Sequence, residues 1–204
     1  MAASNPNTRL EAFCDGVFAI ALTLLIIDIK IPSTVEFSSS TELWLAIKHI
    51  MPSIFAFILS FFIIFITWVN HHNAFKMIDK SSVSFIYANG FLLLTVVFIP
   101  FPTSLVGEYI LSDHSTPAVF LYTSIIAIQG IAWVLLSAAS LKNDLAKSEK
   151  AIIQIKNNRK NGYFTFIVYS LLAIISFWFP QIIAIITTLT LIFWLYYGIK
   201  MKHE

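Results

Sequence analysis

The sequence predicts an all-α membrane protein with six transmembrane helices per chain, and three observations lead to this fold class. Apolar residues make up 58% of the 204 residues and charged residues only 12%, whereas soluble domains are roughly half apolar and a quarter charged. The apolar residues fall into six runs of about 20 residues, the length that crosses a bilayer. The basic residues cluster in particular loops between these runs, which is typical of multi-pass membrane proteins.

The six predicted helices belong to one domain that covers residues 1–204. Their approximate ranges are 10–31, 49–71, 83–106, 116–140, 162–179 and 181–199. Only Pro180 separates the last two ranges, so we expect these helices to form a tight hairpin. Pro52, Pro100 and Pro102 lie near predicted helix ends, where a missing backbone N–H costs least.

The distribution of basic residues predicts the orientation of the chain. The loops on one side carry only Lys30 and Lys48, and the loops and termini on the other side carry the remaining eleven bases. These eleven are Arg9, Lys76, Lys80, Lys142, Lys147, Lys150, Lys156, Arg159, Lys160, Lys200 and Lys202. Lys and Arg concentrate on the cytoplasmic side of membrane proteins. Both termini are therefore predicted to be cytoplasmic, and residues 141–161 to form a basic cytoplasmic linker between two three-helix halves.

The first predicted helix contains a carboxylate near its start. Asp15 and Gly16 occupy a turn where a plain lipid anchor would carry Leu or Val. An ionisable group inside a spanning segment is costly, so it usually faces protein or water and marks a functional path. The alternative is that Asp15 lies at the depth of the lipid headgroups and caps the helix.

One apolar face of the first helix is a candidate pore wall. At about 100° per residue its members lie within roughly a third of the helix circumference, and they are Gly16, Ile20, Thr23, Leu24, Ile27 and Ile31. Asp15 points away from this face. Rings of Ile or Leu side chains can close a pore by dewetting. The alternative is ordinary packing or lipid contact, because periodicity alone selects no face on a helix that is apolar all round.

The motif Arg9-x-x-x-Phe13-Cys14-Asp15-Gly16 resembles the first-helix signature of the transmembrane protein 175 family. Members of this family are potassium channels of prokaryotic membranes and of eukaryotic endosomes and lysosomes. The six-helix count supports the resemblance, which is of the prokaryotic single-repeat type. Cys14 departs from the family pattern, which has Ser at this position, and a thiol is a poor hydrogen-bond donor.

The resemblance implies a homotetramer in the cell membrane of a prokaryote, with the first helices of four copies around one path for potassium ions. Ile20 is implied to be the narrowest point, and Thr23 a hydroxyl associated with selectivity. Leu24 and Ile27 continue the same face as further rings, so we expect an apolar constriction that gates and sieves partly hydrated ions. The Thr-Val-Gly-Tyr-Gly filter of ordinary potassium channels is absent from the sequence. The expected partners are potassium ions, the lipid bilayer and other copies of the chain, with no nucleic acid, cofactor or resident metal.

A polar network is expected to hold the first helix against the second. Its members are Arg9, Asp15, Trp68, His71 and His72. Arg9 and Asp15 lie about 9 Å apart along the helix axis, so a bridging residue, one of the two histidines, is expected to join them. Protonation of that imidazole would make gating sensitive to pH. The alternative for the histidines is solvation at the membrane surface.

A potassium-selective or potassium-preferring cation channel is the leading prediction, and the alternative is a proton-coupled transporter or a proton leak through the Arg, Asp and His network. Transporters usually contain interrupted helices, whereas the first helix is unbroken after Gly16, which favours a channel. An enzyme is not expected, because the sequence has no nucleophile with a base, carboxylate pair or metal cluster at workable spacing. The single cysteine also excludes a Cys-x-x-Cys site.

Overall fold

The computed structural model describes residues 7–30 and 39–200, with side chains as far as residue 192. This part of the chain folds into seven α-helices: α1 (Thr8–Leu24), α2 (Ser40–Lys76), α3 (Val83–Phe98), α4 (Pro100–Tyr109), α5 (Ser115–Lys142), α6 (Glu149–Ile175) and α7 (Pro180–Lys200). Because α3 and α4 form one continuous apolar unit, Val83–Tyr109, the described residues contain six helical units. The all-α, six-helix prediction is confirmed.

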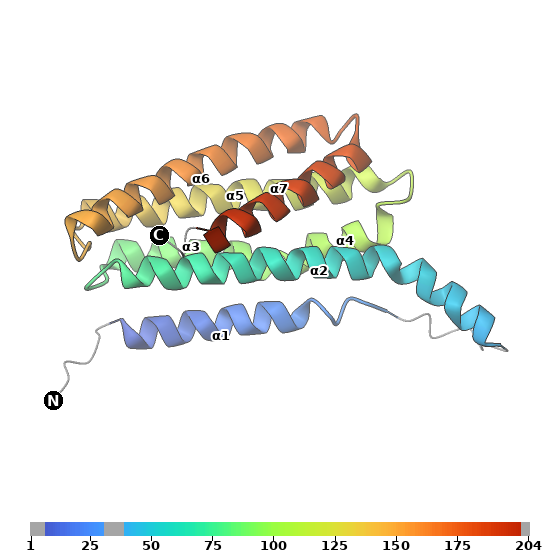
Figure 1. Cartoon of the computed structure of the whole chain (residues 1–204), viewed down its shortest axis with the longest axis horizontal. Helices are drawn as coiled ribbons and strands as arrows, with labels where there is room; N and C mark the ends of the chain where they lie inside the picture. The colour runs from blue at the N-terminus through green and yellow to red at the C-terminus, as the bar shows by residue number, and fades with distance from the viewer. Residues whose placement is uncertain (1–6, 31–38, 201–204) are drawn as a thin grey trace.

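Three helices in the described residues are long and apolar enough to cross a membrane: Ser40–Lys76, Val83–Tyr109 and Ser115–Lys142. The last helix adds a shorter apolar stretch, Pro180–Ile192. Both Ser40–Lys76 and Val83–Tyr109 contain proline, a residue that has no backbone N–H to donate to a helical hydrogen bond. Pro52 lies inside α2, and the N-terminal part of this helix bends away from the bundle (Figure 1). Pro100 separates α3 from α4.

Several helix boundaries differ from the predicted ones. The first helix ends at Leu24 and is followed by turns, whereas α2 begins at Ser40 rather than near 49. Helix α6 begins at Glu149, so most of the predicted linker 141–161 is helical. The Ser148 hydroxyl caps this helix by accepting a hydrogen bond from the Ala151 N–H at 3.2 Å. Hydropathy marks only the part of a helix that lipid surrounds, and a capped helix continues beyond it with polar residues.

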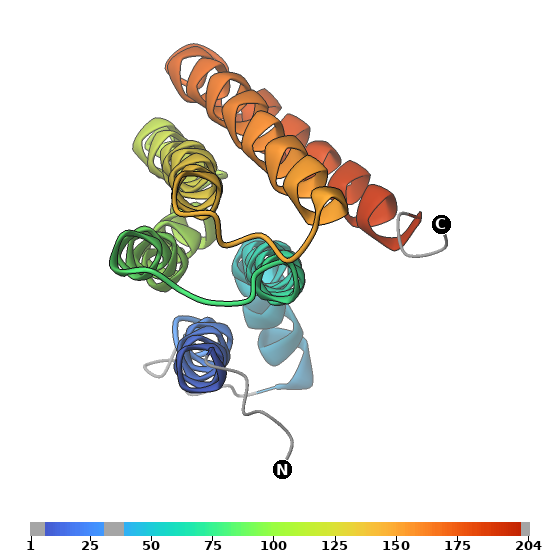
Figure 2. The ribbon, with the colours of Figure 1, turned by 90° about the vertical axis from the view of Figure 1, so that its left-hand side faces the viewer.

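Helix α5 packs against four other helices, α3, α4, α6 and α7. Helix α1 lies at the edge, where it contacts α2 and α3 (Figures 1 and 2). Helices α5 and α6 approach each other closely at two glycines. A Cβ built on Gly130 would lie 2.8 Å from the Gly162 carbonyl oxygen, and a Cβ on Gly162 would lie 2.8 Å from the Gly130 carbonyl oxygen. Small residues at such crossings are typical of membrane helices.

Two loops, 77–82 and 143–148, meet at one end of the bundle. Backbone hydrogen bonds join them, from Asp79 N to Leu145 O at 3.0 Å and from Lys147 N to Met77 O at 2.9 Å. The start of α1 lies at the same end (Figure 1). The basic residues that flank these loops are therefore gathered at one end of the molecule.

Candidate functional site

The helix α1 has one side buried by the rest of the chain and one side left open. The buried side consists of Cys14, Phe18, Ala21 and, directly after the helix, Leu25, each no more than 1% exposed. These positions recur every three or four residues, as expected of one helix face, and they face α2 and α3. A single copy of the chain thus covers one face of α1 only.

The open side of α1 contains the predicted pore-wall residues. The side chains of Ile20, Leu24 and Ile27 are 59%, 40% and 66% exposed, and Gly16 and Thr23 are also exposed. Ile27 belongs to the turn that follows α1, where its N–H donates to the Leu24 carbonyl oxygen at 3.1 Å. Ile31, the last member of the predicted face, lies outside the described residues. The structure therefore leaves uncovered the five members that it describes.

Two residues of this open side are small or polar. The Thr23 hydroxyl donates a hydrogen bond to the Ile20 carbonyl oxygen at 2.9 Å, which leaves the lone pairs of Oγ1 free to accept. A Cβ built on Gly16 would meet no described atom within 4 Å. The packing inside one chain therefore does not require a glycine at this position.

A buried hydrogen-bond chain holds the closed side of α1 against two neighbouring helices. The Asn89 amide on α3 donates from Nδ2 to the Cys14 sulfur at 3.1 Å. The Oδ1 atom of the same amide lies 2.7 Å from Nε2 of His71 on α2. Since Oδ1 can only accept, His71 donates from Nε2. All three side chains are at most 2% exposed, so α1, α2 and α3 share one polar contact in their interior.

Asp15 has a different partner. Trp68 on α2 donates its indole N–H to Asp15 Oδ1 at 2.8 Å. The Trp68 ring stacks on His72, with the ring centroids 5.9 Å apart and the planes 20° from parallel. Among the described residues, no hydrogen bond or ion pair joins Arg9 to Asp15 or to either histidine. The structure therefore separates the expected network into an Asp15–Trp68–His72 group and a Cys14–Asn89–His71 group.

Asn89 is the residue that the sequence interpretation missed. It lies in the predicted helix 83–106, where neighbouring residues are almost all apolar. A polar side chain inside such a helix needs a partner, because lipid offers none. That isolated amide was the available signal, although it does not reveal which helix carries the partner.

Phe13 of the motif is 62% exposed and makes no contribution to the buried side of α1.

Comparison with known proteins assigns the fold and the motif to one family. The model of the family described as "Endosomal/lysosomal potassium channel TMEM175" matches residues 9–100. The chain is 35% identical over 174 residues to a potassium channel of Chamaesiphon minutus, an alignment that covers 83% of this chain and 85% of the relative. The chain belongs to the TMEM175 family. A potassium channel of Chryseobacterium sp. is 31% identical and is aligned over 92% of this chain and 91% of the relative.

A solved TMEM175 structure has the same fold. The crystal structure of a lysosomal potassium-selective channel TMEM175 homolog from Chamaesiphon minutus superposes with a TM-score of 0.80 at 30% identity, over 94% of this chain and 97% of the other. The similar lengths of the chains confirm the single-repeat type. The family predicted from the first-helix motif is thus confirmed, and the chain belongs to a family of channels and not of enzymes.

Proposed function

We propose that the chain is one subunit of a potassium-selective or potassium-preferring channel, in which α1 lines the pore of a homotetramer. The observation that carries this proposal is the open side of α1, where Ile20 and Leu24 stay exposed while the opposite side of the helix is fully buried. The potassium-channel relatives from Chamaesiphon and Chryseobacterium support the choice of ion. Four open sides that face one axis would form a continuous apolar wall.

The proposed gate is a ring of Ile20 side chains from four subunits. A hydrocarbon ring cannot replace the hydration shell of an ion as backbone carbonyls do, so it excludes ions when it is narrow enough to lose its water. Leu24 and Ile27 would form further rings on the same side. The Thr23 hydroxyl would offer a weak oxygen site between them, because its own hydrogen is already bonded to the Ile20 carbonyl.

The two hydrogen-bond groups behind α1 would set the position of this gate. The Cys14–Asn89–His71 chain joins α1 to α2 and α3, and the Asp15–Trp68 bond joins it to α2 a second time. Asp15 thus acts on the helix that carries the gate and lies outside the ion path. In this arrangement His71 is a structural member of the interior, and Arg9 is exposed to solvent or lipid headgroups.

The proposed topology places both termini in the cytoplasm of a prokaryotic cell and the chain in the cell membrane. The loops 77–82 and 143–148 lie together at the end where α1 begins. Their flanking lysines would therefore face one compartment, as the positive-inside rule requires. The basic first half of α6 would extend beyond the membrane surface on the same side.

Purified protein in liposomes under a potassium gradient tests the proposed function. Potassium flux that a membrane potential drives, without a need for a proton gradient, is the expected result. Flux that stops when the proton gradient is removed would indicate the proton-coupled transporter instead, and proton entry without potassium flux would indicate a proton leak. Native mass spectrometry of the same sample measures the subunit number, for which four is expected.

A further inference from the structure

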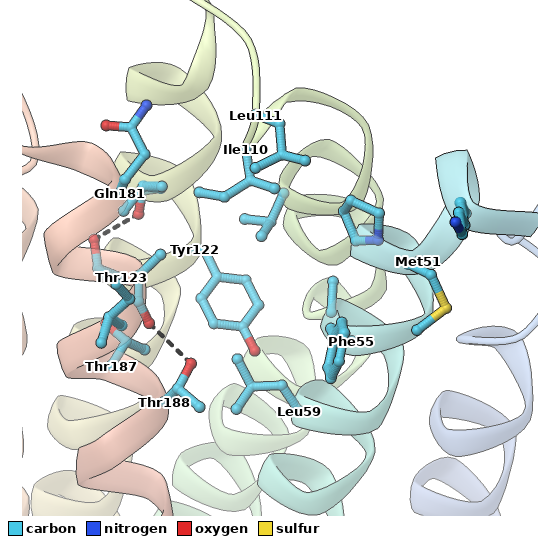
Figure 3. A pocket seen from close by; sticks show the side chains of 17 residues that line it. Met51, Phe55, Leu59, Ile110, Leu111, Tyr122, Thr123, Gln181, Thr187 and Thr188 are labelled. Atoms are coloured by element: carbon cyan, nitrogen blue, oxygen red, sulfur yellow. Dashed lines mark hydrogen bonds between the residues drawn. The ribbon is translucent and has the colours of Figure 1, made fainter. Parts of the chain in front are cut away.

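A cavity of about 560 Å³ lies between α2, α4, α5 and α7, away from the α1 face (Figure 3). Its size is in the range of small-molecule sites in proteins. The wall is mostly hydrocarbon, from side chains such as Met51, Phe55, Leu59, Ile110 and Ile185. Tyr122 of α5 stands at its back (Figure 3).

Most polar groups in the wall already have hydrogen-bond partners. The pairs are Tyr122 with Ser60 at 2.9 Å, Thr123 with the Val119 carbonyl at 2.7 Å, Thr188 with the Ala184 carbonyl at 2.9 Å and Gln181 with Ser115 at 3.0 Å. The Thr187 hydroxyl, by contrast, is 1% exposed and has no partner among the described residues. Buried hydroxyls are normally bonded, but this oxygen has almost no accessible surface, so it lies behind the cavity wall and does not face an occupant.

The only charged side chain in the described wall is that of Lys48, on the exposed part of α2. Among the residues that the structure describes, no acidic side chain lines the cavity to balance it. From Lys48 to Leu59, α2 extends about 16 Å along its axis. That length is about half of the ~30 Å hydrocarbon core, or the depth of one leaflet. The cavity is thus as deep as one lipid tail, with a cation at one end of its wall.

We propose that this cavity binds a membrane phospholipid with an anionic headgroup. One acyl chain fills the space between α2 and α7, and the phosphate lies against the Lys48 ammonium. Basic residues next to a membrane favour anionic lipids in this way. The hydrocarbon wall gives the acyl chain an apolar environment like that of the bilayer interior. This binding site is independent of the pore.

Native mass spectrometry of the full chain in detergent tests the proposal, with added phosphatidylglycerol or phosphatidylcholine as the probe. Wild-type protein is expected to retain phosphatidylglycerol better. Lys48→Gln is expected to lower the affinity for phosphatidylglycerol about fivefold and to leave phosphatidylcholine unchanged. Ala184→Phe places a ring in the cavity and is expected to lower the retention of both lipids.

Matched controls separate a bound lipid from lipid that coats the whole surface. Ile182→Phe adds a ring on α7 at a position that is 54% exposed and outside the cavity. Lys80→Gln removes a charge from the other end of the bundle. Both controls are expected to retain lipid as the wild type does. Equal retention by Ala184→Phe and Ile182→Phe would overturn the proposal. So would loss of the oligomer in Ala184→Phe with lipid retention unchanged, because a second copy of the chain would then be the occupant.

Discussion

Trp68 donates its indole N–H to Asp15 at 2.8 Å, and this bond joins the motif acid on α1 to the C-terminal part of α2. The carboxylate is thereby engaged on the side of α1 that faces its own chain. Ile20, five residues further along, is 59% exposed on another side of the helix. The acid and the proposed gate therefore occupy different sides of one helix, which assigns them different tasks.

Trp68→Phe removes this hydrogen bond and keeps most of the ring. We expect the change to destabilise the protein by about 1–2 kcal/mol, because hydrogen bonds to charged groups contribute more to stability than hydrogen bonds between neutral groups. The thermal unfolding midpoint in detergent measures the effect. Trp178→Phe is the matched control, since the Trp178 ring is 68% exposed and its loss should leave the midpoint nearly unchanged. Equal midpoints for the two variants would contradict the importance of the Asp15 contact.

Asn89→Leu is expected to lower the free energy of unfolding by about 1–3 kcal/mol, because it leaves the buried His71 without its acceptor.

Cys14→Ser tests the other half of the same hydrogen-bond chain. A hydroxyl oxygen accepts a hydrogen bond better than a thiol sulfur, so the serine variant should gain about 0.5–1.5 kcal/mol where Asn89 is present. A double-mutant cycle measures the coupling. If the serine gives the same gain in the Asn89→Leu background, then the gain does not come from the Asn89 amide.

Gly130→Ala tests the close crossing of α5 and α6. The added methyl group would lie 2.8 Å from the Gly162 carbonyl oxygen, so we expect a loss of about 1–3 kcal/mol from overpacking. Gly90→Ala is the control, because a Cβ on Gly90 meets no described atom within 4 Å. A helical alanine there should be neutral or stabilising by roughly 0.5–1 kcal/mol. Unfolding of both variants in detergent distinguishes the two sites, and a tolerant Gly130 would show that the helices can separate.

Gly16→Ala separates the fold of one chain from the assembly of several. One chain leaves open space beside Gly16, so the fold of the monomer should tolerate the methyl group. Where four α1 helices meet, close approach depends on small residues. We expect potassium flux or the tetramer population to decrease while the helix content from circular dichroism stays constant. An unchanged tetramer with unchanged flux would indicate that Gly16 faces lipid.

The presence of the first helix and its family motif could be predicted from the sequence, because both signals are local, although the helix ends at Leu24 and not at residue 31. The Asp15 motif and the face that starts at Gly16 both follow from residues within a few turns of one another. The partners of Cys14 and Asp15 could not be predicted in the same way. They depend on how α2 and α3 rotate against α1, and apolar helices give little periodic signal about that rotation.

The helix boundaries show a second limit of hydropathy. Glu149 starts α6 well before the apolar run near 162, because the Ser148 cap and intrahelical hydrogen bonds stabilise a helix in water as well as in lipid. Conversely, the first helix ends at Leu24 although the apolar residues continue to Ile27. Hydropathy predicts which residues lipid surrounds, but the ends of the helices do not coincide with the ends of the apolar runs.

Two isoleucine variants, one in α1 and one directly after it, determine whether Ile20 forms the gate of the proposed pore. Ile26 is 53% exposed, close to the 59% of Ile20, but it lies outside the proposed pore face. In liposomes under a potassium gradient, Ile20→Asn is expected to raise potassium flux and to reduce the preference over sodium, because a polar ring holds water where a hydrocarbon ring excludes it. Ile26→Asn should conduct as the wild type does. Equal flux and selectivity in Ile20→Asn and the wild type would show that Ile20 does not form the gate.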